Sequence, residues 1–533
     1  MATPLIRPRP TDAHAAEAPI PPGPKRLEKL ASRNLRRMGA SRRSDIRAWA
    51  AKVATWLLAS VCTGSGSDCM IWAALSAALK DDLDVALSVQ HAFLSEQSGS
   101  KQEFLHRLYP DSIIFINCKD LPYADTATAH GRRVLPVPKR WQNFTGGFPC
   151  TSASGLSTAS GSDANRRCVA NEDLATGSVF AAIIGLLEER ISLMREDGEE
   201  FLLVVLENVL RLATPPRGGG ASNLDVCISR LQALGLLCAV FHLTPADFGV
   251  PASRPRIYIV CAIVPNMDQG TFAHVMADCM NSIVGSALDI IDNYLLPETS
   301  KYIQDQLAQS KAKVAGRQGD SLGAVLDAGG IITNHVRKHS NTSAESCLKP
   351  RKWHAKHEQY YEGRPDLWWP EAHRCTAEQL SAFPTLSAIG DRQMEVLQYS
   401  GVTEFPERAP RTIEVKHNLD RTHVLHGIAS TILPGGEQYL THRCRLMHPI
   451  EAIRLQGIFV PSEVADDFLG LLQDLGGNAF ETSCCLAATM CGLAALAHSI
   501  SSIAVPRPLN VPDDDSSSES SSLLRLPKRK RLT

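Results

Sequence analysis

The sequence has no excess of charge of either sign. Its 533 residues include 55 Lys and Arg against 56 Asp and Glu, which gives a formal net charge of −1. Any affinity for a polyanion must therefore come from local basic patches and not from the overall charge. Hydrophobic residues make up 44% of the chain, which is enough for one large buried core or two of ordinary size.

Disulfide spacing and runs of membrane length are also missing. The 15 cysteines are odd in number and scattered along the chain, which favours a reducing compartment such as the cytosol or the nucleus. The N-terminal stretch has no apolar core, so no secretory signal is expected. The most apolar run, CCLAATMCGLAALA, is too short to span a bilayer. We expect this run to form a buried helix and the protein to be soluble.

Strand and helix patterns alternate from about residue 46 to residue 264. The strand candidates are ATWLLASVC, DVALSVQHAF, DSIIFIN, FLLVVLENV and PRIYIVCAIV. Between them lie helix candidates such as DCMIWAALSAALK, FAAIIGLLEERISLM and LDVCISRLQALG. This alternation predicts an α/β fold with a doubly wound, mostly parallel sheet that is covered on both faces.

Composition divides the rest of the chain. Residues 1–45 are rich in Pro, Ala and Arg and predict a disordered basic arm, either solvated or in contact with phosphates. Residues 46–265 would form the main domain, 266–440 a smaller domain, and 441–505 the return to the main domain. Residues 506–533 join an acidic serine-rich run to LPKRKR, which predicts a disordered tail with a nuclear-import signal.

A glycine turn and an acid follow the first two predicted strands. In SVCTGSGSD, Gly64 and Gly66 lie between a strand and a helix, where they allow a tight turn and the close approach of a ligand. Glu96 lies where the second strand should end, and a carboxylate there can hydrogen-bond ribose hydroxyls. Taken alone, an ordinary turn and a surface acid explain these residues equally well.

A cysteine, an acid and two arginines occupy three further segments. Cys150 lies in the small-residue loop GGFPCTSASG, which is unlike the setting of a buried structural cysteine. Glu207 closes a strong strand, at the sheet edge where ligands bind in open parallel sheets. Arg254 and Arg256 come just before another strand. The order of these residues matters more than any one of them.

In this order, the segments resemble the motifs of the cytosine-C5 methyltransferase family. SVCTGSG is similar to its cofactor motif I, Glu96 to the motif II acid, GFPCTSAS to the catalytic Pro-Cys motif IV, and ENV to motif VI. GVPASRPRIYIV resembles motif VIII, RLMHPIEAIRLQG motif IX and GGNAF motif X. The resemblance covers roughly residues 52–264 and 440–500. It implies the Rossmann-like fold of class I methyltransferases.

The resemblance implies a covalent mechanism. Cys150, held by Pro149, would add to C6 of cytosine and make C5 nucleophilic. Glu207 would hydrogen-bond the N3/N4 edge of the base. Arg254 and Arg256 would bind the base carbonyl and help to orient the loop. After methyl transfer the C5 proton would leave, and the cysteine would be eliminated.

The resemblance also implies S-adenosylmethionine as the methyl donor. The residues expected at its site are Cys62, Thr63, Gly64, Ser65, Gly66, Glu96, Asp120 and Asn478. Asp120 would contact the adenine, and Asn478 would close the pocket.

Several positions depart from the family pattern. Cys62 stands where the family has a phenylalanine against the cofactor, and Thr151 follows the nucleophile in place of glutamine. Ala252 replaces the glutamine that opens motif VIII, and Phe480 and Glu481 replace small apolar residues in motif X. These departures leave the catalytic residues in place. They fit a weak or highly regulated enzyme.

The family reads its target with the segment between motifs VIII and IX, here about 266–440. Its basic and aromatic residues can meet phosphates and stack on bases. The nucleic-acid candidates are Arg351, Lys352, Trp353, Lys356 and Arg364. An ordinary packed subdomain with tryptophan in its core is the alternative. Histidines and cysteines between 335 and 375 match no common zinc-finger spacing, so no metal is expected.

The favoured function is a nuclear DNA cytosine-5 methyltransferase, with DNA and targeting or chromatin proteins as partners. The recognition segment lacks the Cys-Phe-Thr signature of the branch that methylates tRNA, which favours DNA. One alternative is an RNA cytosine-5 methyltransferase. The other is a catalytically silent member that binds nucleic acid. A target base inside a duplex would have to be flipped into the Cys150 pocket.

Overall fold

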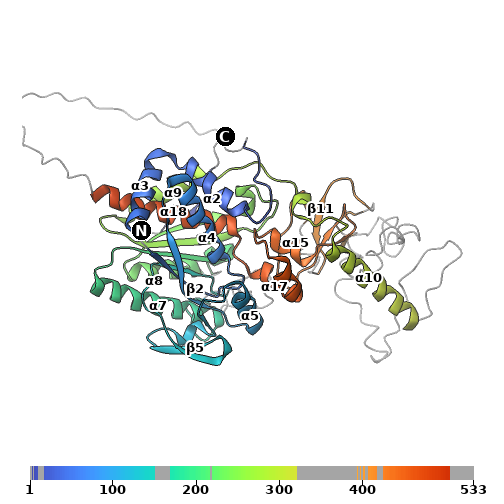
Figure 1. The fold of residues 1–533 in the computed structure, drawn as a ribbon, viewed down its shortest axis with the longest axis horizontal. Helices are drawn as coiled ribbons and strands as arrows, with labels where there is room; N and C mark the ends of the chain where they lie inside the picture. The colour runs from blue at the N-terminus through green and yellow to red at the C-terminus, as the bar shows by residue number, and fades with distance from the viewer. Residues whose placement is uncertain are drawn as a thin grey trace, which may run out of the picture.

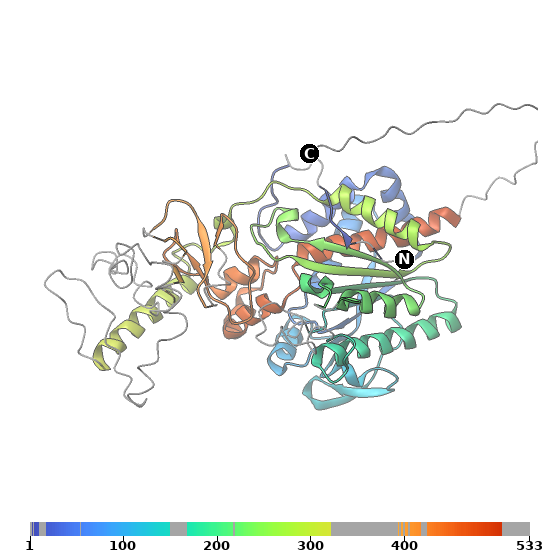
Figure 2. The same cartoon turned by 180° about the vertical axis from the view of Figure 1, so that it is seen from behind.

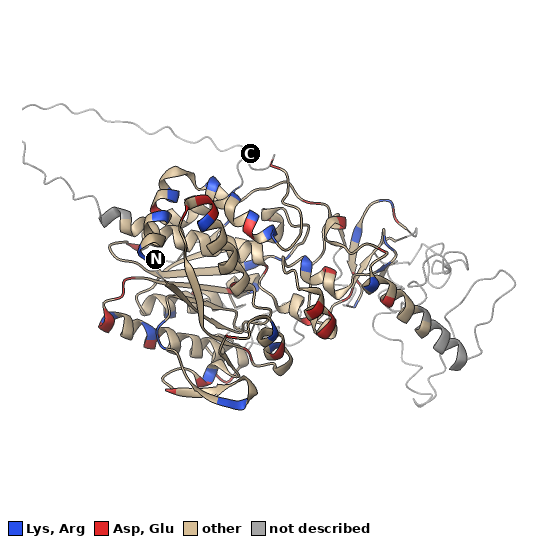
Figure 3. Ribbon diagram, in the orientation of Figure 1, with Lys and Arg blue, Asp and Glu red and all other residues tan. Residues whose placement is uncertain are grey.

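The computed structural model describes residues 3, 5–9, 17–53, 55–149, 168–216, 219–320, 393, 396–397, 400–402, 406–416 and 424–503. Figure 1 shows a large lobe, built on a twisted sheet with helices on both faces, and a smaller lobe beside it. In Figure 3 acidic and basic residues are intermixed over both lobes. This distribution agrees with the near-zero net charge.

The large lobe holds a ten-stranded sheet in the order β1-β9-β10-β8-β7-β2-β3-β4-β5-β6. The strands are β1 (Leu5–Ile6), β2 (Thr55–Val61), β3 (Ser88–Ser95), β4 (Ile114–Phe115), β5 (Thr126–Ala129), β6 (Arg133–Pro136), β7 (Asn143–Gly146), β8 (Leu202–Val209), β9 (Leu237–Leu243) and β10 (Arg256–Ile263). Strands β4, β3, β2, β7 and β8 run parallel to one another. The doubly wound, mostly parallel α/β sheet is thus confirmed.

Strand β10 interrupts the parallel part of the sheet, and β5 is a second strand that runs antiparallel to its neighbours. Strand β10 lies between β8 and β9 and runs antiparallel to both. Only the 3-10 turn η4 (Pro245–Phe248) and a loop join β9 to β10, whereas parallel neighbours are usually joined through a helix. Because of its direction, β10 begins at the edge where the parallel strands end. Its first residue, Arg256, therefore lies at that edge.

Helices cover both faces of the sheet, as Figures 1 and 2 show. One face packs against α2 (Arg26–Arg37), α3 (Gly39–Lys52), α4 (Ser67–Leu83), α9 (Gln269–Ile283) and α18 (Thr482–Ile503). The other face packs against α7 (Ala175–Asp197) and α8 (Asn223–Ala233). In β8, Leu203 and Val205 face the first group, and Leu202 and Val204 face the second. Burial on both faces explains the unbroken apolar run of this strand.

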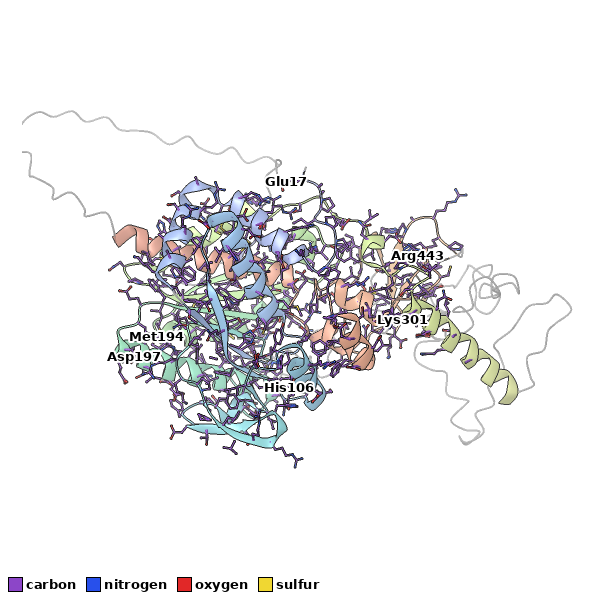
Figure 4. The ribbon with its side chains drawn as sticks, viewed as in Figure 1. Glu17, His106, Met194, Asp197, Lys301 and Arg443 are labelled. Carbon is purple, nitrogen blue, oxygen red and sulfur yellow. The ribbon has the colours of Figure 1, made fainter. Side chains whose placement is uncertain are left out.

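The expected disordered arm over residues 1–45 is wrong in two places: Leu5–Ile6 pair with β9, and residues 26–37 and 39–45 lie in α2 and α3. Helix α2 buries Leu27, Leu30 and Leu35 in the core. Arg37 donates to Ile283 O at 2.8 Å and Gly285 O at 2.7 Å, and it forms an ion pair with Glu17, which Figure 4 labels. Arg26 and Arg33 are also buried. These basic side chains hold the fold together and are not available to phosphates.

The apolar run near the C-terminus forms a core helix, as expected. The expectation that this run is too short to span a bilayer is wrong, because Thr482–Ile500 of α18 have the length and hydropathy of a membrane span. However, 94% of that window is buried inside the protein. The helix lies against β8, β10 and the helices of the first face. Its apolar surface is therefore covered by the protein itself.

Two expected domain boundaries are wrong. Helix α9 lies beyond residue 265, yet Phe272, Met276 and Met280 are buried in the same core as α18. The smaller lobe has an antiparallel sheet in the order β12-β11-β13-β14, formed by β11 (Arg411–Glu414), β12 (Val424–His426), β13 (Gln438–Leu440) and β14 (Arg445–Leu446). Pairing between β13 and β14 crosses the expected boundary at 440. Hydrophobic packing and strand pairing set these limits, and composition does not show them.

Short helices connect the two lobes. They are α5 (Gly99–Leu108), α15 (Pro449–Arg454), α16 (Ser462–Asp467) and α17 (Leu469–Asn478), and α10 (Lys301–Asp320) extends outward from this region. Phe104 of α5 shares a buried cluster with Ile453 of α15 and Leu472 of α17. Arg445 and Glu451 form a buried ion pair with two contacts of 2.8 Å. These contacts hold α17 beside the sheet edge.

Candidate active site

The candidate site lies along one edge of the large sheet. The carboxyl ends of β2, β3, β4, β7 and β8 meet there, and β10 begins there. Open α/β sheets bind their ligands at this edge. The residues singled out in the sequence come from the segments that follow these strands.

The turn after β2 has the tight backbone that its glycines predict. Cys62, Gly64 and Gly66 have φ angles of 53°, 57° and 71°. A Cβ on Gly66 would lie 2.7 Å from Cε2 of Tyr109, so this position requires glycine for space as well as for conformation. Around Gly64 the nearest such contact is a backbone oxygen at 3.9 Å. There is thus space beside the Cα of Gly64, although the residue is buried and its amide donates to Glu96.

The hydroxyl groups of the turn bond within it. Thr63 Oγ1 donates to Ser60 Oγ at 3.0 Å, and the hydroxyls of Ser65 and Ser67 are 2.8 Å apart. Both Thr63 and Ser65 are buried. These expected cofactor residues therefore shape the turn from inside.

Glu96 is fixed against this turn. Its Oε2 accepts from Gly64 N at 3.0 Å, and its Oε1 accepts from Ser98 N at 2.9 Å. Asp120 ends the 3-10 turn η1 (Cys118–Asp120), which follows β4, and is exposed. The ends of three adjacent strands thus carry a glycine turn and two carboxylates.

Cys62 contacts a second thiol instead of presenting a free side chain. A hydrogen bond with Cys118 raises the pKa of the Cys62 thiol, and burial raises it further. The same hydrogen bond lowers the pKa of the Cys118 thiol. Two hydrogen-bonded cysteine side chains thus stand where the family has an aromatic residue. This pair lies between the turn after β2 and the turn that ends at Asp120.

The loop after β7 is held from two sides. Asn208 Nδ2, in the ENV segment, donates to Phe148 O at 3.1 Å. A Cβ on Gly147 would lie 2.5 Å from Cε1 of Phe480, so the ring packs directly on the loop backbone. Pro149 follows and is half-buried. Cys150, the expected nucleophile, lies outside the described residues, as does Thr151.

Glu207 and Arg256 form an ion pair at the end of β8. Arg256 Nε lies 2.9 Å from Glu207 Oε1, and the two side chains are 12% and 13% exposed. The register pairs Glu207 with Tyr258 and Arg256 with Val209. The two charged residues are therefore diagonal neighbours on one face of the sheet, which explains their contact.

Arg254 makes contacts that the sequence did not predict. It is buried, and its guanidinium donates to Ile432 O at 2.9 Å, Gly477 O at 3.0 Å and Ala479 O at 2.8 Å. These carbonyls belong to the smaller lobe and to the segment before α18. Arg254 therefore ties separate parts of the chain together, and its expected contact with the base carbonyl stays a prediction.

The motif X segment is also explained by local contacts. The amide of Asn478 donates to Asp474 O at 3.1 Å and Oδ1 at 3.0 Å, in its own helix. Its role at the cofactor stays a prediction. Glu481 Oε2 accepts from Cys484 N at 2.8 Å and caps α18. The departure at Glu481 thus serves the helix.

The expected nucleic-acid residues lie outside the described residues, as does the histidine-rich stretch from 335 to 375. Within the part of the chain that the structure describes, no group of three His, Cys, Asp or Glu residues has the geometry of a metal site. Asn208 and Phe480 were not assigned to the site from the sequence. Their proximity to the cysteine loop becomes visible only in the fold.

A comparison with known families decides the assignment. The family model described as C-5 cytosine-specific DNA methylase matches residues 115–460, which is more than half of the chain. The protein belongs to this family. The match includes Pro149, Glu207 and Arg256, so it contains the half of the sheet edge that carries the ion pair.

Three solved structures are similar to this chain at low sequence identity. The Spodoptera frugiperda DNMT2 mutant has 13% identity and a TM-score of 0.39, with 82% of this chain and 99% of that chain covered. S. pombe Dnmt2 has 12% identity and a TM-score of 0.37, with 82% and 98% covered. The Entamoeba histolytica methyltransferase EhMeth has 10% identity and a TM-score of 0.29, with 46% and 61% covered. Similarities this weak add nothing to the family assignment. No curated protein matches the chain.

Proposed function

We propose that the protein transfers a methyl group from S-adenosylmethionine to C5 of cytosine in DNA. The observation that supports this most is the Glu207–Arg256 ion pair, 2.9 Å long, at the sheet edge that also carries the Pro149 loop. An acid, an arginine and the loop before Cys150 are the groups that cytosine activation requires. The Gly64 turn and Glu96 lie along the same edge.

The protein's residues divide the chemistry among them. Cys150 adds as a thiolate to C6 of the base, which turns C5 into an enamine-like nucleophile. Glu207 hydrogen-bonds the N3/N4 edge and favours the electrophilic form of the ring. Arg256 binds the base carbonyl and keeps Glu207 in place through their ion pair. The C5 proton then leaves, and Cys150 is eliminated.

The residues at the other half of the edge fit the cofactor. S-adenosylmethionine, when bound, supplies an electrophilic methyl group. There is space beside the Cα of Gly64, and Glu96 is held where a carboxylate can bind ribose hydroxyls. Asp120 is exposed after the next strand, and it would contact the adenine.

DNA is the proposed substrate because the recognition segment lacks the Cys-Phe-Thr signature of tRNA-methylating relatives. We also propose a nuclear location, from the basic stretch LPKRKR, and targeting or chromatin proteins as partners. Deleting residues 526–531 in a tagged copy tests the location. Unchanged nuclear signal would contradict the import role.

Labelled S-adenosylmethionine tests the substrate. The protein is incubated with a DNA duplex or a tRNA transcript, and the label is followed to 5-methylcytosine. We expect label in DNA, and none with the Cys150→Ala variant. If only the RNA is labelled, RNA and not DNA is the substrate. Label in neither, with no cofactor binding by calorimetry, would favour a silent binding protein.

A further inference from the structure

Two adjacent residues at the start of α7 contact the chain on both sides of the segment that contains Cys150. Thr176, the second residue of α7, is fully buried. Its Oγ1 donates to Pro149 O at 2.8 Å. This carbonyl belongs to the peptide that joins Pro149 to Cys150. The contact thus reaches the last described residue before the proposed nucleophile.

The returning end of the loop packs on the next residue of the same turn. A Cβ on Gly177 would lie 1.9 Å from Asn171 O and 2.8 Å from Cys168 O. Only glycine fits so close to these two carbonyls. Adjacent residues of α7 therefore contact the chain just before residue 150 and just after residue 167.

A peptide group is planar, so the direction of a carbonyl sets the plane of the whole group. Fixing the carbonyl of Pro149 therefore fixes the direction in which the chain enters Cys150. Asn208 fixes the preceding carbonyl, that of Phe148, from the strand that carries Glu207. Together the two hydrogen bonds fix the position of residues 148–149 relative to the ion pair of Glu207 and Arg256.

We propose that Thr176 is a positioning residue for the nucleophile. Its hydroxyl holds the Pro149 carbonyl, and with it the peptide group that leads to the proposed nucleophile, in a fixed direction relative to Glu207 and Arg256. This inference rests on the proposed function, since it takes Cys150 to be the nucleophile. Reaction rates depend steeply on such placement, because a shift of about 1 Å costs about a hundredfold.

Two substitutions separate the hydroxyl from the shape of the side chain. Thr176→Val keeps the branched shape and removes the donor, whereas Thr176→Ser keeps the donor. Ser76→Ala is a matched control, because Ser76 Oγ donates to Leu87 O at 2.7 Å beside the amino end of β3, away from the site. All four proteins are compared for melting temperature and for S-adenosylmethionine affinity before kinetics.

The measurement is the single-turnover rate of methyl transfer to DNA. We expect Thr176→Val to slow it about ten- to a hundredfold with unchanged cofactor affinity. Thr176→Ser should restore it to within about threefold of wild type, and Ser76→Ala should leave it unchanged. A wild-type rate for Thr176→Val would overturn the proposal. So would a Thr176→Ser protein as slow as Thr176→Val.

A second readout does not depend on methyl transfer. Alkylation of Cys150 by iodoacetamide, followed by peptide mass spectrometry, reports the setting of the thiol directly. We expect a changed alkylation rate in Thr176→Val and wild-type rates in Thr176→Ser and Ser76→Ala. If wild type transfers no methyl group to DNA or RNA, the proposed function fails. Equal alkylation rates in the four proteins would then overturn the positioning role as well.

Discussion

The two halves of the sheet edge are built in different ways. In the half formed by β2, β3 and β4, backbone amides hold the carboxylate in place, as when Gly64 and Ser98 donate to Glu96. In the half formed by β7, β8 and β10, side chains from distant segments converge, as in the pair of Glu207 and Arg256. We infer that the first half tolerates single substitutions with graded losses. In the second half, we expect activity to depend on every one of the converging side chains.

The largest expected effect falls in the second half, at Glu207. Glu207→Gln keeps the shape and removes the charge that pairs with Arg256 at 2.9 Å. Loss of a group acting in proton transfer and base activation costs about a thousandfold in kcat. Methylation of a DNA duplex under saturating cofactor measures it. A kcat within about threefold of wild type would remove Glu207 from the mechanism.

The next largest effects are expected at two arginines of one short segment, Arg254 and Arg256. Arg254→Met removes the donor to three backbone carbonyls, and we expect a loss of about 3 kcal/mol in the free energy of unfolding. Arg256→Met should lower kcat about a hundredfold, with a much smaller loss of stability. Urea unfolding and methylation kinetics are measured on both. If both variants lose the same amounts of stability and of kcat, the separate roles of the two arginines are wrong.

His448 lies outside both halves and affects stability alone. Its Nδ1 accepts from Ile450 N at 3.2 Å, and burial lowers its pKa from 6.5 to about 4. Between these pH values the unfolded chain binds a proton that the folded chain does not. Stability should therefore fall as the pH drops through this window, by about 2 kcal/mol from this residue.

His448→Asn tests this effect, because asparagine keeps a capping acceptor and does not titrate. Urea unfolding at pH 7 and pH 4.5 should show a smaller acid loss in the variant than in wild type. His426→Asn, at an exposed position, serves as the control and should keep the wild-type loss. If all three proteins lose the same free energy of unfolding between pH 7 and pH 4.5, His448 does not cause the loss.

The smallest effect is expected in the first half, at Glu96. Glu96→Gln keeps an acceptor for Gly64 N, but it loses the acceptor for Ser98 N and the charge that would bind ribose hydroxyls. We expect about a tenfold weaker S-adenosylmethionine affinity by calorimetry, with the fold unchanged. Glu103→Gln on exposed α5 surface should have no effect. Unchanged affinity in Glu96→Gln would contradict the ribose contact.

Local patterns predicted much of this architecture. The strand–turn–helix at Gly64, the strand ending in Glu207 and the buried helix α18 are visible because apolar spacing and glycine positions report local structure. Strand β7 is short and polar, NFTG, so no pattern marks it. In α2, Leu27, Leu30 and Leu35 carried a helical signal that the basic composition hid.

The roles of Arg254 and Arg256 show what local patterns do not contain. Both arginines belong to one RPR sequence, and both were expected at the base. The direction of β10 places Arg256 beside Glu207, whereas Arg254 is enclosed by carbonyls from more than 170 residues away. Such contacts depend on the whole fold. The same is true of Phe480, which packs on Gly147.

Covalent trapping tests the central claim most directly. The protein and S-adenosylmethionine are mixed with a duplex containing 5-fluorocytosine, whose fluorine does not leave as the C5 proton does, and run on a denaturing gel. Cys150→Ala protein and a fluorinated tRNA run beside it. We predict a shifted band with the DNA that is absent in the variant. A band that persists in Cys150→Ala, or no band with either nucleic acid, would contradict the account.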